Sequence, residues 1–273
     1  MDNNSQLEHL QSFFPKKITN INEINNFKTI NFAYKNIYTF ISSNSNIEGN
    51  FFSLNLFSLD SELNNNKNII INLDSNYDML NYYRGLYQVD IFNTEIENLY
   101  ISNKIINSKE ELLNYIDFLN KSNLFDNIII LMNFENNFFD IFHISNFNFL
   151  ITDIKSKSII KLDKILNVLS EYKKINFGIF FIDIDTKMDN LNEHIKFITN
   201  NFLSIHNNLF LIGIVFTHPA LETAKKRKLI AFKNFNFINE SYIFHEFKEI
   251  FYNYISYIKE KKNWAQKQKI KIM

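Results

Sequence analysis

The chain has 273 residues, 46% of them hydrophobic and 16% aromatic, and its 29 basic and 29 acidic side chains cancel in formal charge. This composition excludes an intrinsically disordered chain, and the zero net charge excludes a general electrostatic attraction for nucleic acid. Because the sequence contains no cysteine, disulfides, thiolate metal sites and thiol nucleophiles are excluded as well.

The sequence predicts one domain with a short segment at each end. Residues 1–17 are predicted to form an N-terminal helical extension, residues 18–262 a single α/β domain, and residues 263–273 a basic tail. No linker, repeat or change in composition divides the central part. The N-terminus lacks a signal-peptide pattern, and no apolar run approaches the roughly 20 residues that span a bilayer, so we expect a cytoplasmic protein.

Apolar runs alternate with stretches of helical spacing along the central domain. The predicted buried strands are 37–41, 69–73, 127–131, 149–151, 177–184 and 209–216, and the predicted helices include 110–120, 161–172 and 191–203. Continuous apolar strands that alternate with amphipathic helices predict an α/β fold with a mostly parallel sheet and helices on both faces.

The connection after the first predicted strand has the position of a phosphate-binding loop but lacks its residues. Residues 42–53 separate strand 37–41 from a segment, beginning at Phe52, that we predict to be an amphipathic helix. A phosphate-binding loop presents the backbone N–H groups of glycines, and a lysine, to the phosphates. Here the only glycine is Gly49, and there is no lysine.

Four further segments follow this loop in a familiar order. Residues 53–56 read Ser-Leu-Asn-Leu, 69–74 form an apolar run that ends in Asp74, 125–130 read Phe-Asp-Asn-Ile-Ile-Ile, and 211–214 read Leu-Ile-Gly-Ile. In this order they resemble the MinD/ParA group of deviant-Walker ATPases, and within it the FlhG-type regulators of flagellar number. Residues 5–10 are faintly similar to the activation helix of that type. The resemblance implies a P-loop NTPase-like fold of the SIMIBI class.

The resemblance also assigns roles to the loop positions, and the residues there depart from the family pattern. Ser42 keeps the first serine, whereas Asn44 stands at the signature lysine, Asn46 at a glycine, Glu48 at a glycine, Gly49 at the Walker lysine, Asn50 at the magnesium-binding hydroxyl and Phe51 at the next threonine. Phosphoryl transfer needs close N–H donors, a cation and a metal ion. We expect Glu48 to repel phosphate and the ring of Phe51 to lie at the metal edge of the site.

Three positions outside the loop complete the comparison. Leu131 stands where the family has the Walker B aspartate, Asp74 is the best surviving acidic residue, and Asp183 falls near the base-recognising asparagine. Asp183 and Asp185 alternate along a strand, so they share a face and are candidates for binding a cation. The alternative is a helix cap for Asp74 and two solvated carboxylates at the end of that strand.

The combined losses favour a non-catalytic MinD/FlhG-like pseudo-ATPase, a regulatory or scaffolding protein in flagellar placement or number or in cell-pole organisation. No cofactor is expected under this hypothesis. The alternative is an active ATPase that binds ATP and Mg²⁺ in an unorthodox pocket and cycles between a monomer and a membrane-associated dimer. A third possibility is an unrelated α/β protein whose similarity is compositional.

The C-terminal segment and the loop also bear on partners. Residues 241–273 carry an apolar stripe, Trp264 and several lysines, which predict either a last core helix with a solvated tail or peripheral contact with an anionic inner membrane. We expect protein partners, such as flagellar or polar machinery, and no nucleic acid. Asn44 replaces the lysine that bridges the family's dimer, so a monomer or hetero-complex is expected.

Overall fold

The computed structural model of the chain describes residues 36–43, 47–73, 90–94, 96–133, 138–170, 175, 177–184, 193, 209–217 and 219–226. The predicted extension 1–17 and the C-terminal segment 241–273 lie outside these residues. Asn44, Asn46 and Asp74 also lie outside them, as does the predicted helix 191–203 apart from residue 193.

The described residues form one sheet of eight strands with helices on both faces. The strands are β1 (Asn36–Ser42), β2 (Asn68–Asn72), β3 (Ile91–Asn93), β4 (Leu99–Ser102), β5 (Asn127–Asn133), β6 (Phe147–Thr152), β7 (Phe177–Ile184) and β8 (Leu209–Phe216). The helices are α2 (Ile47–Asn64), α4 (Lys109–Ser122), α5 (Ser156–Ser170), α7 (Pro219–Lys226) and the 3₁₀ helix η2 (Phe139–His143).

The strand order in the sheet is β3-β4-β2-β5-β1-β6-β7-β8. Only β3 runs antiparallel to its neighbour, so the predicted mostly parallel sheet is confirmed. From β1 the chain continues to β2 on one side, and from β5 it crosses to β6 on the other. In open α/β sheets, ligands bind outside the carboxyl ends of the strands at such a reversal.

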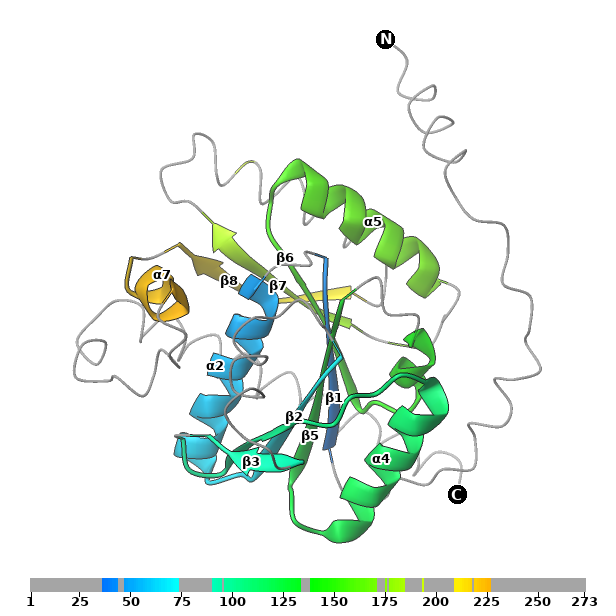
Figure 1. The fold of residues 1–273 in the computed structure, drawn as a ribbon. Helices are drawn as coiled ribbons and strands as arrows, with labels where there is room; N and C mark the ends of the chain where they lie inside the picture. Colours follow the sequence, from blue (N-terminus) through cyan, green and yellow to red (C-terminus); the bar gives the residue numbers. More distant parts are fainter. Residues whose placement is uncertain are drawn as a thin grey trace, which may run out of the picture. The chain divides into compact units, whose positions relative to one another are not determined.

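The two faces of the sheet are covered by different helices. Helices α2 and α7 lie over one face, and α4 and α5 lie over the other (Figure 1). Helix α4 begins where the hydroxyl of Ser108 accepts the backbone N–H of Glu111 at 3.1 Å, and it ends at Asn123 in the left-handed conformation. A serine at the N-cap and a left-handed residue after the last turn are both common at helix ends. The predicted helix 161–172 begins five residues earlier than expected, at Ser156.

Helix α2 is buried around its whole circumference rather than on one face. Every residue from Phe51 to Ser61 is buried, so the predicted helix is present but its predicted amphipathic character is wrong. Its polar residues fit because they bond to the helix itself: Asn55 donates to the carbonyl of Phe51 at 2.8 Å, and Ser58 donates to the carbonyl of Asn55 at 2.7 Å. A helix buried on all sides has no polar face by which its pattern would be recognised.

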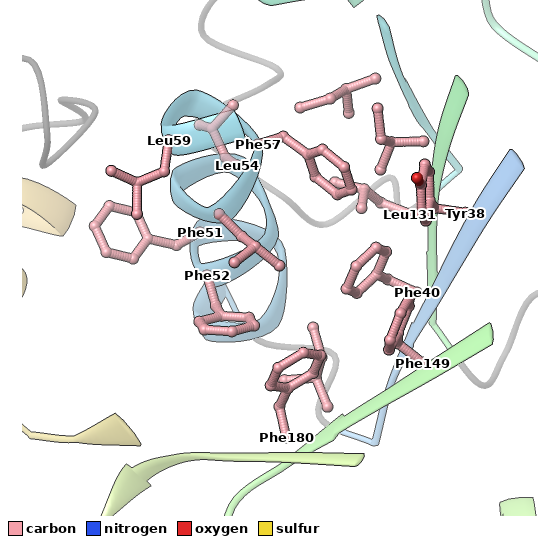
Figure 2. Packing of buried hydrophobic residues seen from close by; sticks show 14 of the residues in the cluster. Tyr38, Phe40, Phe51, Phe52, Leu54, Phe57, Leu59, Leu131, Phe149 and Phe180 are labelled. Carbon is pink, nitrogen blue, oxygen red and sulfur yellow. The ribbon is translucent and has the colours of Figure 1, made fainter. Parts of the chain in front are cut away.

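Aromatic rings join α2 to the sheet (Figure 2). Phe52 lies 4.9 Å from Phe180 of β7, and Phe57 meets Phe40 of β1 edge to face at 5.6 Å between ring centroids. Phe40 also stacks on Phe149 of β6 at 4.7 Å. These contacts combine large buried areas with favourable ring geometries, so they hold α2 above β1, β6 and β7.

A buried carboxylate ties the other end of α2 to the amino ends of β2 and β5. Asp60 is 3% exposed. Its oxygens accept hydrogen bonds from the side-chain amides of Asn64 (2.8 Å), Asn66 (3.1 Å), Asn68 (3.0 Å) and Asn127 (3.2 Å). Burying a carboxylate is costly unless it is hydrogen-bonded, and these four donors meet that requirement. The asparagines here are therefore part of the folded framework.

We expect Asp60→Ala to lower the free energy of unfolding by about 2–4 kcal/mol, because it removes an acceptor from the buried amides of Asn68 and Asn127. Urea denaturation followed by circular dichroism measures the change. The matched control is Asp163→Ala on α5, where the exposed carboxylate accepts a bond from Asn167 at 3.3 Å; a change within about 0.5 kcal/mol is expected there. Equal losses in the two variants would contradict the role of Asp60.

Candidate functional site at the carboxyl ends of the strands

The structure places part of the predicted phosphate-binding loop in the first turn of helix α2. Ser42 ends β1 and α2 begins at Ile47, so residues 43–46 separate them. The predicted loop positions Glu48, Gly49 and Asn50 therefore belong to the first turn of the helix. The N–H groups of a first helical turn have no partner within the helix and are groups that bind phosphate in P-loop proteins, so the departure from the family pattern lies in the side chains.

Hydrogen bonds join Ser43, the first residue of this connection, to the end of β6. The backbone N–H of Ser43 donates to the carbonyl of Ile151 at 2.9 Å. The Ser43 hydroxyl donates to that of Thr152 at 2.8 Å, and the Thr152 hydroxyl donates to the carbonyl of Asp153 at 3.1 Å. Ser43 and Thr152 are both 1% exposed. These polar groups are satisfied by each other.

Phe51, which the sequence analysis expected at the metal edge of the site, packs its ring into the hydrophobic core. Phe51 is 6% exposed and belongs to the main hydrophobic cluster. Figure 2 shows its ring on the side of α2 that faces away from Phe40.

Leu131 occupies the strand expected to carry the Walker B aspartate. It lies on β5, beside Phe40 of β1 in the register of the sheet, and is 0% exposed. Its side chain belongs to the same apolar cluster as Phe40 (Figure 2). The strand expected beside the loop is therefore present, but the position of the acidic group holds a packed leucine.

Of the three carboxylates predicted at the site, the structure describes Asp183, whereas Asp74 and Asp185 lie outside the described residues. Asp183 lies near the end of β7, with a left-handed φ of 57°. An extra residue bulges from β7 here, because Phe181 pairs with Ile214 whereas Ile184 pairs with Phe216. Asp tolerates this conformation better than most residues, and bulges of this kind re-aim side chains at sheet edges.

Asp183 accepts hydrogen bonds from one residue that follows β6 and one that follows β8. One of its oxygens accepts the ammonium group of Lys155 at 2.9 Å, and the other accepts the hydroxyl of Thr217 at 3.3 Å. The ammonium also lies 3.5 Å from the carboxylate of Asp153, whose side chain is 3% exposed. Sequence reasoning missed Lys155, Asp153 and Thr217. The only available signal was their position directly after predicted strands.

The described residues hold few groups suited to acid–base or metal chemistry. No cluster of three or more His, Asp or Glu side chains able to hold a metal ion occurs among them. At the end of β4, Ser102 hydrogen-bonds the hydroxyl of Tyr115 at 2.9 Å, and burial raises the pKa of this tyrosine above its usual value. The phenol therefore stays neutral at physiological pH and supplies no general base.

No protein-family model and no curated protein matches the chain. Solved structures do match it. The MinD cell division protein of Aquifex aeolicus superposes with a TM-score of 0.64 at 13% identity, over 81% of this chain and 97% of that one. The chain has the MinD/ParA fold. The MinC:MinD complex of the same organism gives 0.61 at 12% identity, over 81% and 96%. A ParA family ATPase of Chlorobium tepidum gives 0.55 at 12% identity, over 78% and 96%.

These likenesses confirm the predicted P-loop NTPase-like architecture and concern the fold alone, because the identities are 12–13%. The arrangement of β1, α2 and β5 is that of the MinD/ParA fold, and Phe40 and Leu131, which are neighbours on β1 and β5, are both buried and apolar. Helices in the described part of the chain all fall short of the length and apolar character that crossing a membrane requires.

We expect Leu131→Asp, which restores an acidic residue on β5, to lower the free energy of unfolding by about 4 kcal/mol or more, because a carboxylate would be buried without a partner. Urea denaturation is the measurement. Leu131→Met is the matched control, with an expected cost below about 1.5 kcal/mol. A stable Leu131→Asp variant would mean that β5 can still hold a polar group at this position.

Proposed function

We propose that this chain is a non-catalytic pseudo-ATPase with the MinD/ParA fold, acting as a regulatory or scaffolding protein in flagellar placement or number or in cell-pole organisation. The observation that carries the proposal is the packed apolar centre of the nucleotide-binding framework. Leu131 is 0% exposed where an acidic residue would order a metal-bound water, and Phe51 is 6% exposed where a hydroxyl would be expected.

The first turn of α2 supports the same conclusion through its charge. A helix N-terminus attracts anions because its unpaired N–H groups and the helix dipole present partial positive charge. Glu48 is the second residue of α2. An acidic residue in the first turn stabilises the helix and opposes the approach of a triphosphate. With Gly49 at the lysine position, no cation from this turn offsets that repulsion.

A protein partner is the ligand class that best fits a fold kept without its pocket chemistry. Among the structural neighbours is a MinC:MinD complex, in which a protein of this fold assembles with another protein. The flagellar or polar role rests on the resemblance of residues 5–10 and of the ordered motifs in the sequence. We propose a monomer or a hetero-complex, because Asn44 replaces the lysine that bridges the dimer in the resembling family.

We expect titration calorimetry of the full chain with ATP and Mg²⁺ to give no binding heat, because the groups that neutralise phosphate charge are replaced. Light scattering is expected to give the same molar mass with and without ATP. Micromolar binding, or an ATP-dependent dimer, would contradict the pseudo-ATPase and favour the active-ATPase alternative. In that case Asp74→Asn is the variant that tests whether the remaining carboxylate supports turnover.

A deletion strain of the source organism tests the cellular role. We expect altered flagellar number or position, or altered pole organisation, measured by electron and fluorescence microscopy. Complementation with the wild-type chain and with Asp74→Asn is expected to restore the phenotype equally, since a pseudo-ATPase has no need of this carboxylate. Rescue by the wild type alone would indicate a catalytic role, and a deletion without any phenotype would contradict the proposed process.

A further inference from the structure

We propose that the protein binds one internal water molecule beside η2, through hydrogen bonds that the water donates to the side chains of Thr39 and Asn148. Three residues form the site, which we call the inner polar site: Thr39 on β1, Ser145 after η2 and Asn148 on β6. This inference goes beyond the proposed function and does not depend on whether ATP is bound or hydrolysed.

The inner polar site lies on the face of the sheet opposite α2. The rings of Phe40 and Phe149 stack on each other on the α2 side of the sheet (Figure 2). Because side chains alternate between the two faces of a strand, the preceding residues Thr39 and Asn148 point to the other face. These two residues are direct neighbours in the parallel register of β1 and β6. Thr39 is 0% exposed and Asn148 is 4% exposed, so both side chains are removed from bulk solvent.

Carbonyl groups of η2 accept hydrogens from this site. The side-chain N–H group of Asn148 donates to the carbonyl of Phe142 at 3.4 Å, and the hydroxyl of Ser145 donates to the carbonyl of Ile141 at 2.9 Å. The first bond determines the orientation of the Asn148 amide, because the reversed amide would place two carbonyl oxygens against each other.

The groups that remain at the inner polar site are acceptors. Ser145 has a single hydroxyl hydrogen, which Ile141 accepts, so Thr39 donates the hydrogen of the bond between the Thr39 and Ser145 hydroxyls. The oxygen of Thr39 therefore keeps a lone pair. The side-chain carbonyl oxygen of Asn148 is buried and has no hydrogen-bond partner among the described residues. Buried acceptors of this kind are costly, and folded proteins satisfy them with a protein donor or an ordered water molecule.

Two neighbouring acceptors require a small ligand that donates twice. A water molecule has two O–H groups, and two O–H···O bonds of about 2.8 Å join acceptors up to about 5 Å apart, which matches the spacing of adjacent strands. Internal waters typically have two to four polar partners, as this site offers. The three side chains are neutral, so a metal ion or ammonium bound to them would bury a charge that they do not compensate.

A bound water completes the attachment of η2 to the sheet. On its apolar side, Phe142 meets Phe177 of β7 edge to face at 5.2 Å between ring centroids. On its polar side, the carbonyls of Ile141 and Phe142 are bonded to Ser145 and Asn148. Since water-mediated hydrogen bonds are nearly as favourable in enthalpy as direct ones, the water joins these contacts to β1 through Thr39.

Nuclear Overhauser effects between water and the threonine methyl groups test the site in the full chain. We expect a cross-peak at Thr39 with the sign of a long-lived bound water, and none at Thr152. Thr152 is the matched control, because it is 1% exposed and its hydroxyl is already bonded to Ser43 and to the carbonyl of Asp153. A wild-type chain without the Thr39 cross-peak would overturn the proposal.

Two substitutions of similar volume each remove one acceptor from the site. Magnetic relaxation dispersion of the water oxygen nucleus counts long-lived internal waters. We expect the count to fall by one in Thr39→Val and in Asn148→Leu, and to keep the wild-type value in Thr152→Val. An unchanged count in both Thr39→Val and Asn148→Leu would also overturn the proposal.

The same methyl signal distinguishes water from a cation. We expect the chemical shift of the Thr39 methyl group to stay the same when sodium chloride is replaced by potassium or ammonium chloride. A shift that saturates with the concentration of either ion would contradict the water and assign the site to a cation. The ATP titration is independent of all these outcomes.

Discussion

Phenylalanine rings of α2 pack against phenylalanine rings of three adjacent parallel strands, β1, β6 and β7. This contact determines where α2 lies on the sheet. Phe52 meets Phe180, and Phe57 meets Phe40, which itself stacks on Phe149. Burying such a ring contributes about 2–3 kcal/mol relative to leaving it exposed. Because β1, β6 and β7 each supply a ring, α2 cannot slide along the sheet without separating several of these pairs.

Fixing α2 in this way also fixes the region where a nucleotide would bind. The first turn of α2 lies beyond the end of β1, and residues 43–46 join the two elements in the sequence. Opposite this end, Asp60 anchors the helix to β2 and β5 through asparagine amides. Aromatic packing and a buried polar network within the chain therefore hold this framework together.

The sequence predicted most strands well and the β3–β4 edge of the sheet poorly. Strands buried on both faces are continuous apolar runs, so 177–184 agrees with β7 at both ends. The prediction 209–216 also agrees with β8, which forms the other edge. The short strands β3 and β4, with three and four residues, were not predicted, because runs of this length carry too little periodicity to distinguish them from loops. At the candidate site, Asp183 was identified, but its pairing with Lys155 joins residues 28 positions apart. No local pattern encodes such a contact.

By itself the sequence determined the fold class, the order of the six longer strands along the chain, and the absence of lysine and paired glycines from the loop after β1. These properties depend on composition and local periodicity, which can be read without coordinates. The tertiary structure decided which side chains the loop residues and their neighbours contact. It placed Phe51 and Leu131 in the core instead of at a metal site, buried α2 on all sides, and brought Lys155 to Asp183. Burial and ion pairing depend on segments that meet only when the sheet assembles, so they are properties of the folded chain.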